Sequence, residues 1–206
     1  MRPVISIKLA VVALSALSLS ACVSLLPEST PSSVYRLSSP EARTWTGEDW
    51  TVIEVVAPQA PRGLAGDEIA IQMADGRIAY MAAARWIAPT PRIMQTLIVD
   101  TFNGSESHLA PTLPEDGVRA AYELRLDLRE FEAVYDRGDT NAPLVRVRLA
   151  TRLVASRGRR IVGSSVFVGE ARASSNRMGA IVAAFDQAAT QVSQDLADWT
   201  AEQTAR

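Results

Sequence analysis

Residues 122–128 read Tyr-Glu-Leu-Arg-Leu-Asp-Leu, an alternation of apolar and charged side chains that is typical of a β-strand with one solvated face. The parity changes after Arg129, because Phe131 and Ala133 are apolar whereas Glu130 and Glu132 are charged. A β-bulge near Arg129–Glu130 would accommodate this change by adding one residue to the strand. The stretch therefore predicts a half-buried, bulged strand, and the neighbouring segments extend the pattern into a sheet.

The segments that follow predict two further strands. Residues 145–153 alternate apolar side chains with arginines, and residues 162–168 are largely apolar and β-branched. A polar loop at 136–143 and a turn at 156–160 separate the three segments. We expect the first two strands to pair as a hairpin and the third to follow through the turn.

The end of the chain predicts one long helix. Apolar residues recur there at intervals of three and four, which places them on one face of a helix. The positions are Met178, Ile181, Val182, Phe185, Ala189, Val192, Leu196 and Trp199. We expect this stripe to pack on the sheet, with Trp199 closing the core at the end of the helix.

The first half of the chain predicts shorter strands joined by loops. Strands are expected at 34–37 and 50–56, and a loop at 57–66, which contains two Pro and two Gly. Residues 69–73 and 77–81 flank Asp75–Gly76 and predict a hairpin.

A second helix is predicted between the hairpin and the bulged strand. Thr90 can cap it and Pro91 suits its first position, and Asn103–Gly104 ends it. Its buried face would carry Ile93, Met94, Leu97, Ile98 and Phe102. A short strand is expected at 108–110. The fold class is therefore α/β, a single-domain sandwich with a mixed or antiparallel sheet and packed helices, whose strand order the sequence does not fix.

Composition excludes several classes of function. The 206 residues are 48% hydrophobic and 21% charged, which is a globular composition, and the net charge of −2 gives no basic excess for nucleic-acid binding. One Cys and one His exclude an intrachain disulfide and a Cys/His zinc site. We therefore expect no nucleic-acid partner, no metal and no cofactor.

The N-terminus has the features of a signal peptide. Arg2 and Lys8 precede an apolar segment at 9–19, which is too short to cross a bilayer. Leu19-Ser20-Ala21-Cys22 then resembles a bacterial lipobox. The resemblance implies that residues 1–21 are removed and that Cys22 is acylated on sulfur and nitrogen. The alternative is an ordinary signal peptide or a membrane anchor in which Cys22 is incidental.

Residues 22–33 comprise the lipidated Cys and a tether rich in Ser and Pro, and residues 34–206 form the folded domain. Val23 stands where an Asp would retain a lipoprotein in the inner membrane. By resemblance to lipoprotein sorting rules, the protein is expected in the outer membrane, facing the periplasm.

Residues 22–200 together resemble the ABC-type transport auxiliary lipoproteins, the paraquat-inducible protein C group. The segments that carry the resemblance are Cys22, 35–37 (Tyr-Arg-Leu), 53–58 (Ile-Glu-Val-Val-Ala-Pro), 85–89 (Arg-Trp-Ile-Ala-Pro), 122–124 with Phe131-Glu132, and Ala184-Phe185 with Trp199. The loop Gln59–Gly66 departs from the family by being longer and by lacking an aromatic-Leu pair.

The resemblance implies a non-enzymatic partner of an MCE-type lipid transport system. The implied partners are an MCE-domain protein with its permease and ATPase, and a homo-oligomeric ring is possible within the family. The implied fold resembles anticodon-binding domains. The alternative function is a periplasmic carrier that itself holds phospholipid.

An envelope hydrolase is a third hypothesis, and it would depend on the lone His108. Spacing names no partner for this histidine, and Ser164–Ser165 lacks the glycines of a nucleophile elbow. The carboxylates near the bulge could be an acid/base pair, but we favour ion pairs across the hairpin. The acids are Glu123, Asp127, Glu130 and Glu132, and the bases are Arg125, Arg146, Arg148 and Arg152.

Two places are candidates for contact with a partner. Arg157, Arg159 and Arg160 lie in a turn with no acid beside them in the sequence, and guanidinium groups suit anionic head groups or an acidic partner. We favour a solvated turn, and partner contact is the alternative. Arg85–Trp86 is the second place, but for Trp86 we favour the core over an interface, because large aromatic side chains carry much of the core burial. Trp45 and Trp50 could face a partner or a membrane.

Overall fold

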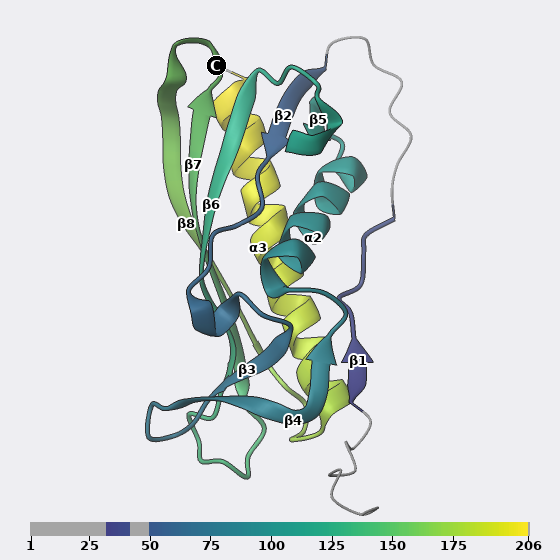
Figure 1. Cartoon of the computed structure of the whole chain (residues 1–206), viewed down its shortest axis with the longest axis vertical. Helices are drawn as coiled ribbons and strands as arrows, with labels where there is room; N and C mark the ends of the chain where they lie inside the picture. The colour runs from purple at the N-terminus through teal and green to yellow at the C-terminus, as the bar shows by residue number, and fades with distance from the viewer. Residues whose placement is uncertain (1–31, 42–49, 206) are drawn as a thin grey trace, which may run out of the picture. The chain divides into compact units, whose positions relative to one another are not determined.

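The computed structural model describes residues 32–41 and 50–205 (Figure 1). The alternating stretch forms β6 (Tyr122–Val134), which pairs with three other strands of the sheet. β6 pairs antiparallel with β7 (Leu144–Ala155) along its whole length, and β7 pairs antiparallel with β8 (Arg160–Arg172). The predicted hairpin and the third strand are confirmed. The expected signal peptide (1–21), Cys22, the tether up to residue 31 and Trp45 lie outside the described residues.

The predicted bulge in β6 is also confirmed. Leu128 pairs with Leu149 and Glu130 pairs with Arg148, which leaves Arg129 without a partner in β7. The inserted residue lets Leu124, Leu126 and Leu128 share the buried face with Phe131 and Ala133 despite the change of parity.

Two short strands share the other edge of β6. β2 (Thr51–Val55) lies parallel to its first residues, and β3 (Glu68–Gln72) lies parallel to its last. Further out, β5 (Leu109–Thr112) is parallel to β2, β4 (Ile78–Trp86) is antiparallel to β3, and β1 (Ser33–Tyr35) is parallel to β4. The sheet is therefore mixed, in the order β1-β4-β3-β6-β2-β5, with β7 and β8 on the other side of β6.

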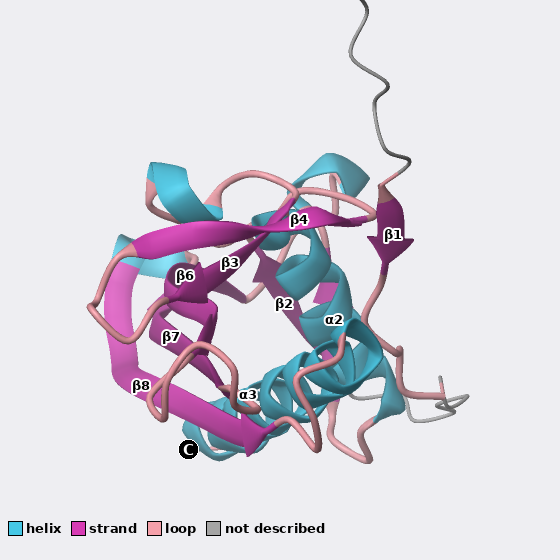
Figure 2. Cartoon of the chain, turned by 90° about the horizontal axis from the view of Figure 1, so that it is seen from below, coloured by secondary structure: helices cyan, strands magenta, loops and turns pink. Residues whose placement is uncertain are grey.

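Two helices lie on the inner face of this curved sheet (Figure 2). α3 (Met178–Thr204) packs against β7 and β8, and α2 (Thr90–Gly104) packs against α3, β2 and β5. Short 3-10 turns occur at Arg62–Leu64 (η2), Pro114–Asp116 (η3) and Arg157–Arg159 (η4). The single mixed α/β domain that the sequence predicts is confirmed.

The core is centred on three aromatic rings from distant segments. Trp86, Phe131 and Phe185 are each at most 1% exposed, and their ring centroids lie 4.9 to 5.7 Å apart. The predicted apolar faces of both helices are buried around them or packed at their edge. At the far end of α3, Trp199 stacks edge-on against Phe167 of β8, as expected of a side chain that closes the core.

The expected cap of α2 is wrong in detail. Pro89 occupies the N-cap position, and Thr90 lies in the helix. The Thr90 hydroxyl and amide both donate hydrogen bonds to the carbonyl oxygen of Gly66, at 3.1 and 2.9 Å. Thr90 therefore fastens the helix to the preceding loop instead of capping its own backbone.

Candidate partner-binding surfaces

The outer face of β6, β7 and β8 carries rows of charged side chains. Arg152 lies 3.2 Å from Asp127, and Arg146 lies 3.9 Å from Glu130, so two of the predicted cross-strand ion pairs are confirmed. Arg146 also forms a shorter pair, of 2.6 Å, with Glu170 of β8. These acids therefore face guanidinium groups, which is the arrangement of an ion-pair network and not of an acid/base couple.

Glu132 lies on the same face and is partly buried. Burial raises the pKa of Glu132, the charge of Glu130 raises it further, and Arg146 opposes both effects. Solvent-exposed ion pairs contribute only about 0–1 kcal/mol each, so the network sets register and solubility more than stability. Next to these charges, β8 exposes two apolar side chains on the same face, Val166 at 46% and Val168 at 43%.

The turn between β7 and β8 presents arginines at one end of the sheet. Arg159 is not free of acids as expected, because its Nη1 donates a hydrogen bond of 3.2 Å to Glu123 at the start of β6. Glu123 is nearly buried there and also pairs with Arg125 at 2.8 Å. The sequence alone does not bring Glu123 to the turn, because the two are 36 residues apart.

Arg157 and Arg160 remain fully available at this turn. Both are exposed, and neither forms an ion pair within the described residues. Arg119, which we did not predict, joins them because the amide of Ser156 donates a hydrogen bond to the carbonyl of Ala121. An open hollow of about 630 Å³ lies between the two chain segments, lined by Arg119, Ala120, Ala121, Ser156 and Arg157. We call Arg119, Arg157 and Arg160 the turn arginines.

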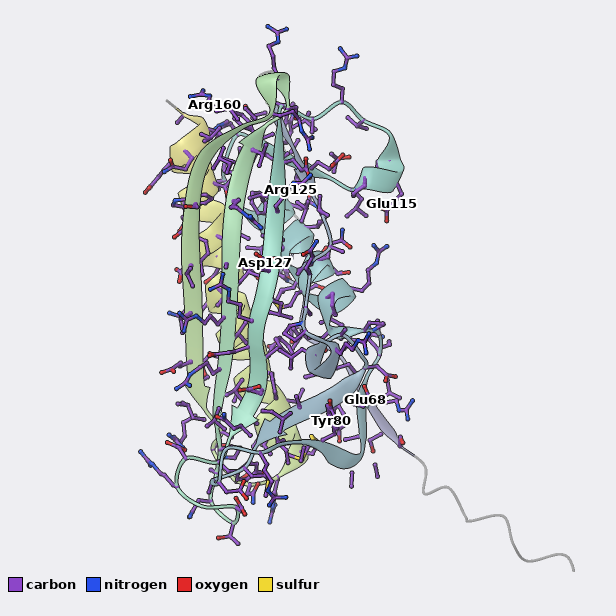
Figure 3. All side chains as sticks on the ribbon, turned by 60° about the vertical axis from the view of Figure 1, so that its left-hand side comes forward. Glu68, Tyr80, Glu115, Arg125, Asp127 and Arg160 are labelled. Carbon is purple, nitrogen blue, oxygen red and sulfur yellow. The ribbon has the colours of Figure 1, made fainter. Side chains whose placement is uncertain are left out.

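Arg85 and Trp86 occupy a different region from the turn arginines. Trp86 is 1% exposed and belongs to the aromatic core, so its alternative role at an interface does not fit. Arg85 is exposed at the end of β4, where its Nη1 lies 3.4 Å from Asp67. In Figure 3, Arg160 lies at the top of the domain, whereas Glu68, the strand partner of Arg85, lies in its lower part.

The length of β6 sets the separation of these two ends. Tyr122 pairs with Ala155 beside the turn, whereas Val134 pairs with β3 beside β4 and β1. Thirteen residues at about 3.3 Å each place the ends roughly 40 Å apart. The candidate residues that we predicted together are therefore two surfaces and not one.

His108 contacts the end of α3. Its Nε2 lies 3.2 Å from the hydroxyl of Thr204, in the last turn of α3, and that hydroxyl also donates to the carbonyl of Thr200. Ser164 and Ser165 belong to β8 and lie on the sheet. Within residues 32–41 and 50–205, no group of three or more His, Cys, Asp or Glu is placed to hold a metal ion.

A small apolar hollow lies between the segment after β1 and the first turns of α2. It measures about 230 Å³ and is lined by Leu37, Ile87, Ile93 and Leu97, with Arg36 and Arg92 at its rim. Sites for drug-sized ligands measure about 300–1,000 Å³, so this hollow is small for a two-chain phospholipid. Neither of the described helices is long and apolar enough to cross a membrane.

Comparison with known proteins gives a family and a fold. A family model described as the ABC-type transport auxiliary lipoprotein component matches residues 35–197. A Xanthomonas campestris protein of family DUF330 is similar in structure, with a TM-score of 0.72 and 26% identity over 84% of this chain and 97% of that one. A second crystal structure, of an uncharacterised protein, has a TM-score of 0.65 and 15% identity over 83% and 99% of the two chains.

A curated relative is also similar. An uncharacterised protein of Bradyrhizobium diazoefficiens is 30% identical over 115 residues, which is 56% of this chain and 30% of the relative. The chain thus spans about a third of the length of that relative.

Proposed function

The chain belongs to the ABC-type transport auxiliary lipoproteins, and we propose from this premise that it serves an MCE-type lipid transport system in the cell envelope. In this proposal Cys22 is acylated, residues 1–21 are removed, and the chain is anchored in the outer membrane and faces the periplasm. The partners are an MCE-domain protein with its permease and ATPase. The observation that carries the proposal is the family match, which spans nearly the whole described domain.

The position of the turn arginines supports a docking role at the end of the domain remote from the anchor. The described domain begins at Ser32, directly before β1, and the turn arginines lie roughly 40 Å away along β6. This end therefore points away from the anchoring membrane when β1 is next to it. The turn arginines form no ion pair within residues 32–41 and 50–205, and they suit carboxylates on a protein partner, because guanidinium binds carboxylate through paired hydrogen bonds.

The proposed role is non-enzymatic. His108 contacts a hydroxyl that is already engaged in the helix, and two acids of the outer face, Asp127 and Glu130, pair with arginines. These contacts support an auxiliary role in which another subunit hydrolyses ATP. The family is described as an auxiliary component, which also supports a non-enzymatic role.

Crosslinking in intact envelopes tests the proposal. The tagged, lipidated protein is purified after crosslinking, and its partners are identified, with Cys22→Ala as the control for anchoring. We expect an MCE-domain protein with its permease and ATPase to be recovered with the wild type. Recovery of bound phospholipid without any transporter subunit would refute the docking role and favour the phospholipid carrier.

A charge reversal tests the docking end separately. The double variant Arg157→Glu with Arg160→Glu is expected to lose most of the co-purified transporter, because it places acids against an acidic partner. Arg177→Glu is the matched control, since Arg177 is also exposed but precedes α3 at the other end of the domain. Equal recovery with the double variant and with the control would show that docking uses another surface.

A further inference from the structure

The end of the domain that holds β1 has an exposed apolar surface. Val34 of β1 is 57% exposed, and Ile87, just after β4, is 54% exposed. Val34 pairs with Arg85 in parallel register, so these two side chains leave the sheet on the same face. Arg36 and Ile87 line the same small hollow next to them. We call Val34, Arg36, Arg85 and Ile87 the β1 patch.

The sequence alternation explains why this patch faces outward. Tyr35 and Trp86 point inward from the two paired strands, and Trp86 is fixed in the aromatic core. Their neighbours must therefore point outward, because successive side chains of a strand alternate between its faces. The amide of Ile87 donates a hydrogen bond to the carbonyl of Tyr35, which holds both segments together.

The chain enters the domain at this same patch. Ser32 is the first described residue and directly precedes β1, and ten residues, 22–31, separate it from the start of the mature chain at Cys22. Ten residues span at most about 35 Å when fully extended. An acyl anchor on Cys22 therefore keeps the β1 patch within that distance of the membrane surface.

We propose that the β1 patch rests on the periplasmic surface of the membrane that the acylated Cys22 enters. The inference depends on the proposed lipidation and adds an orientation to it. Val34 and Ile87 enter the interface between head groups and acyl chains, where apolar side chains leave water. Single exposed apolar residues need no explanation, but here Ile87 lines an apolar hollow and Val34 is exposed on the adjacent strand, at the point where the tether begins.

Of the arginines around the patch, two are paired with acids, and Arg36 can bind a lipid phosphate. Arg85 is held by Asp67 at 3.4 Å and faces Glu68 across the strands, and Arg92 is held by Glu115 at 3.1 Å. Arg36 forms no ion pair within the described residues and is exposed at the rim of the hollow. Its apolar stem can lie along the patch while the guanidinium binds a head-group phosphate.

Fluorescence quenching by lipids tests this orientation in the whole lipidated protein. Cys22 is the chain's only cysteine and its sulfur is acylated in this proposal, so one introduced Cys can be labelled selectively. Ile87→Cys places a fluorophore in the patch. Ile161→Cys is the matched control, because Ile161 is 58% exposed and follows the turn at the opposite end. The vesicles contain phosphatidylethanolamine, phosphatidylglycerol and lipid spin-labelled near the head group.

We expect the label at position 87 to lose at least about half of its emission in these vesicles, while the label at 161 is unaffected. Equal quenching at both positions, in protein that floats with the vesicles, would overturn the orientation but leave the anchor intact. Protein that fails to float would refute the lipid anchor and the orientation together. Aqueous iodide also quenches the label, and its access to position 87 is measured as well. If self-association of the chain protects the label from iodide and vesicles do not, the patch is a subunit interface and the proposal is overturned.

Discussion

At the scale of residues, close packing between β8 and α3 limits what the sequence can change. Gly169 of β8 lies under α3, and a Cβ atom on it would lie 2.2 Å from the carbonyl oxygen of Ala188 and 2.9 Å from Val192. A backbone oxygen of a buried helix cannot move away without shifting the helix. The glycine therefore sets the distance between the helix and the sheet.

We predict that Gly169→Ala destabilises the domain by about 1–3 kcal/mol, the usual cost of overpacking a core. Gly179→Ala is the matched control, because a Cβ at Gly179 meets no atom within 4 Å and alanine favours the helix. Urea unfolding measures both variants. If Gly169→Ala is as stable as the control, α3 does not approach β8 as closely as described.

Two carboxyl groups, those of Asp136 and Glu132, are expected to change the folding stability in opposite directions as pH changes. The hydrogen bond from Arg172 lowers the pKa of Asp136, so its contribution to stability is present at neutral pH and is lost as pH falls through the folded-state pKa. Burial raises the pKa of Glu132, so ionisation of Glu132 makes the folded state less stable as pH rises above the unfolded-state pKa.

We therefore expect Glu132→Gln to raise the free energy of unfolding at neutral pH, and Asp136→Asn to lower it. Both differences should shrink near about pH 3, where both carboxyls are protonated in the unfolded chain. Urea unfolding at the two pH values measures them. A loss of stability for Glu132→Gln at neutral pH would contradict the environment described for this residue.

At the scale of elements, the bulge of β6 keeps two halves of one strand on the same buried face. Arg129 has no partner in β7, and it separates the leucines of the first half from Phe131 and Ala133 of the second. The side-chain period of a strand is two, so one residue more or less exchanges the faces beyond it.

Deletion of Arg129 is expected to cost about 3–5 kcal/mol, comparable with the loss of a buried aromatic residue, because Phe131 would be turned out of the core. Arg129→Ala keeps the backbone length and is expected to change stability by less than about 0.5 kcal/mol, since Arg129 is exposed. Thermal unfolding compares the two. A deletion variant as stable as Arg129→Ala would mean that the bulge does not set the register.

Elements with a strong local signal could be predicted from the sequence, and their assembly could not. The parity of 122–133, the turn at Asp75–Gly76 and the stripe of the last helix each depend on nearby residues, and all are confirmed. The parallel pairing of β2 and β3 with one edge of β6 joins segments far apart in the chain. This pairing depends on how the helices pack on the sheet, and that packing produces no periodic pattern in the sequence.

The same reason explains the errors at the candidate surfaces. Glu123 reaches Arg159 only because β6 and the turn are neighbours in the folded sheet, and Thr90 finds Gly66 only after the loop has folded back. Arg119 could have been found, because it precedes β6 by three residues and β6 pairs with the end of β7. Trp86 was not among these errors, because its size favoured the core and the structure buries it there.

At the scale of the whole molecule, the domain has two ends with different chemistry. Both ends have exposed apolar side chains, Val34 and Ile87 at one and Ile161 at the other, but the chain enters at the β1 end and the turn arginines lie at the other end. The chain belongs to a family of auxiliary transport lipoproteins, and an anchored component of this kind must face both a membrane and a partner. A difference between the two ends of the domain suits these two contacts.

Site-specific photocrosslinking in intact envelopes tests this account most directly. A photoreactive residue is placed at position 157 in the turn in one variant and at position 87 in the β1 patch in the other. The account predicts that position 157 crosslinks to a subunit of the MCE-type transporter, whereas position 87 crosslinks to lipid. A transporter crosslink from position 87 with none from position 157 would contradict it, because the domain would then be anchored in the reverse orientation.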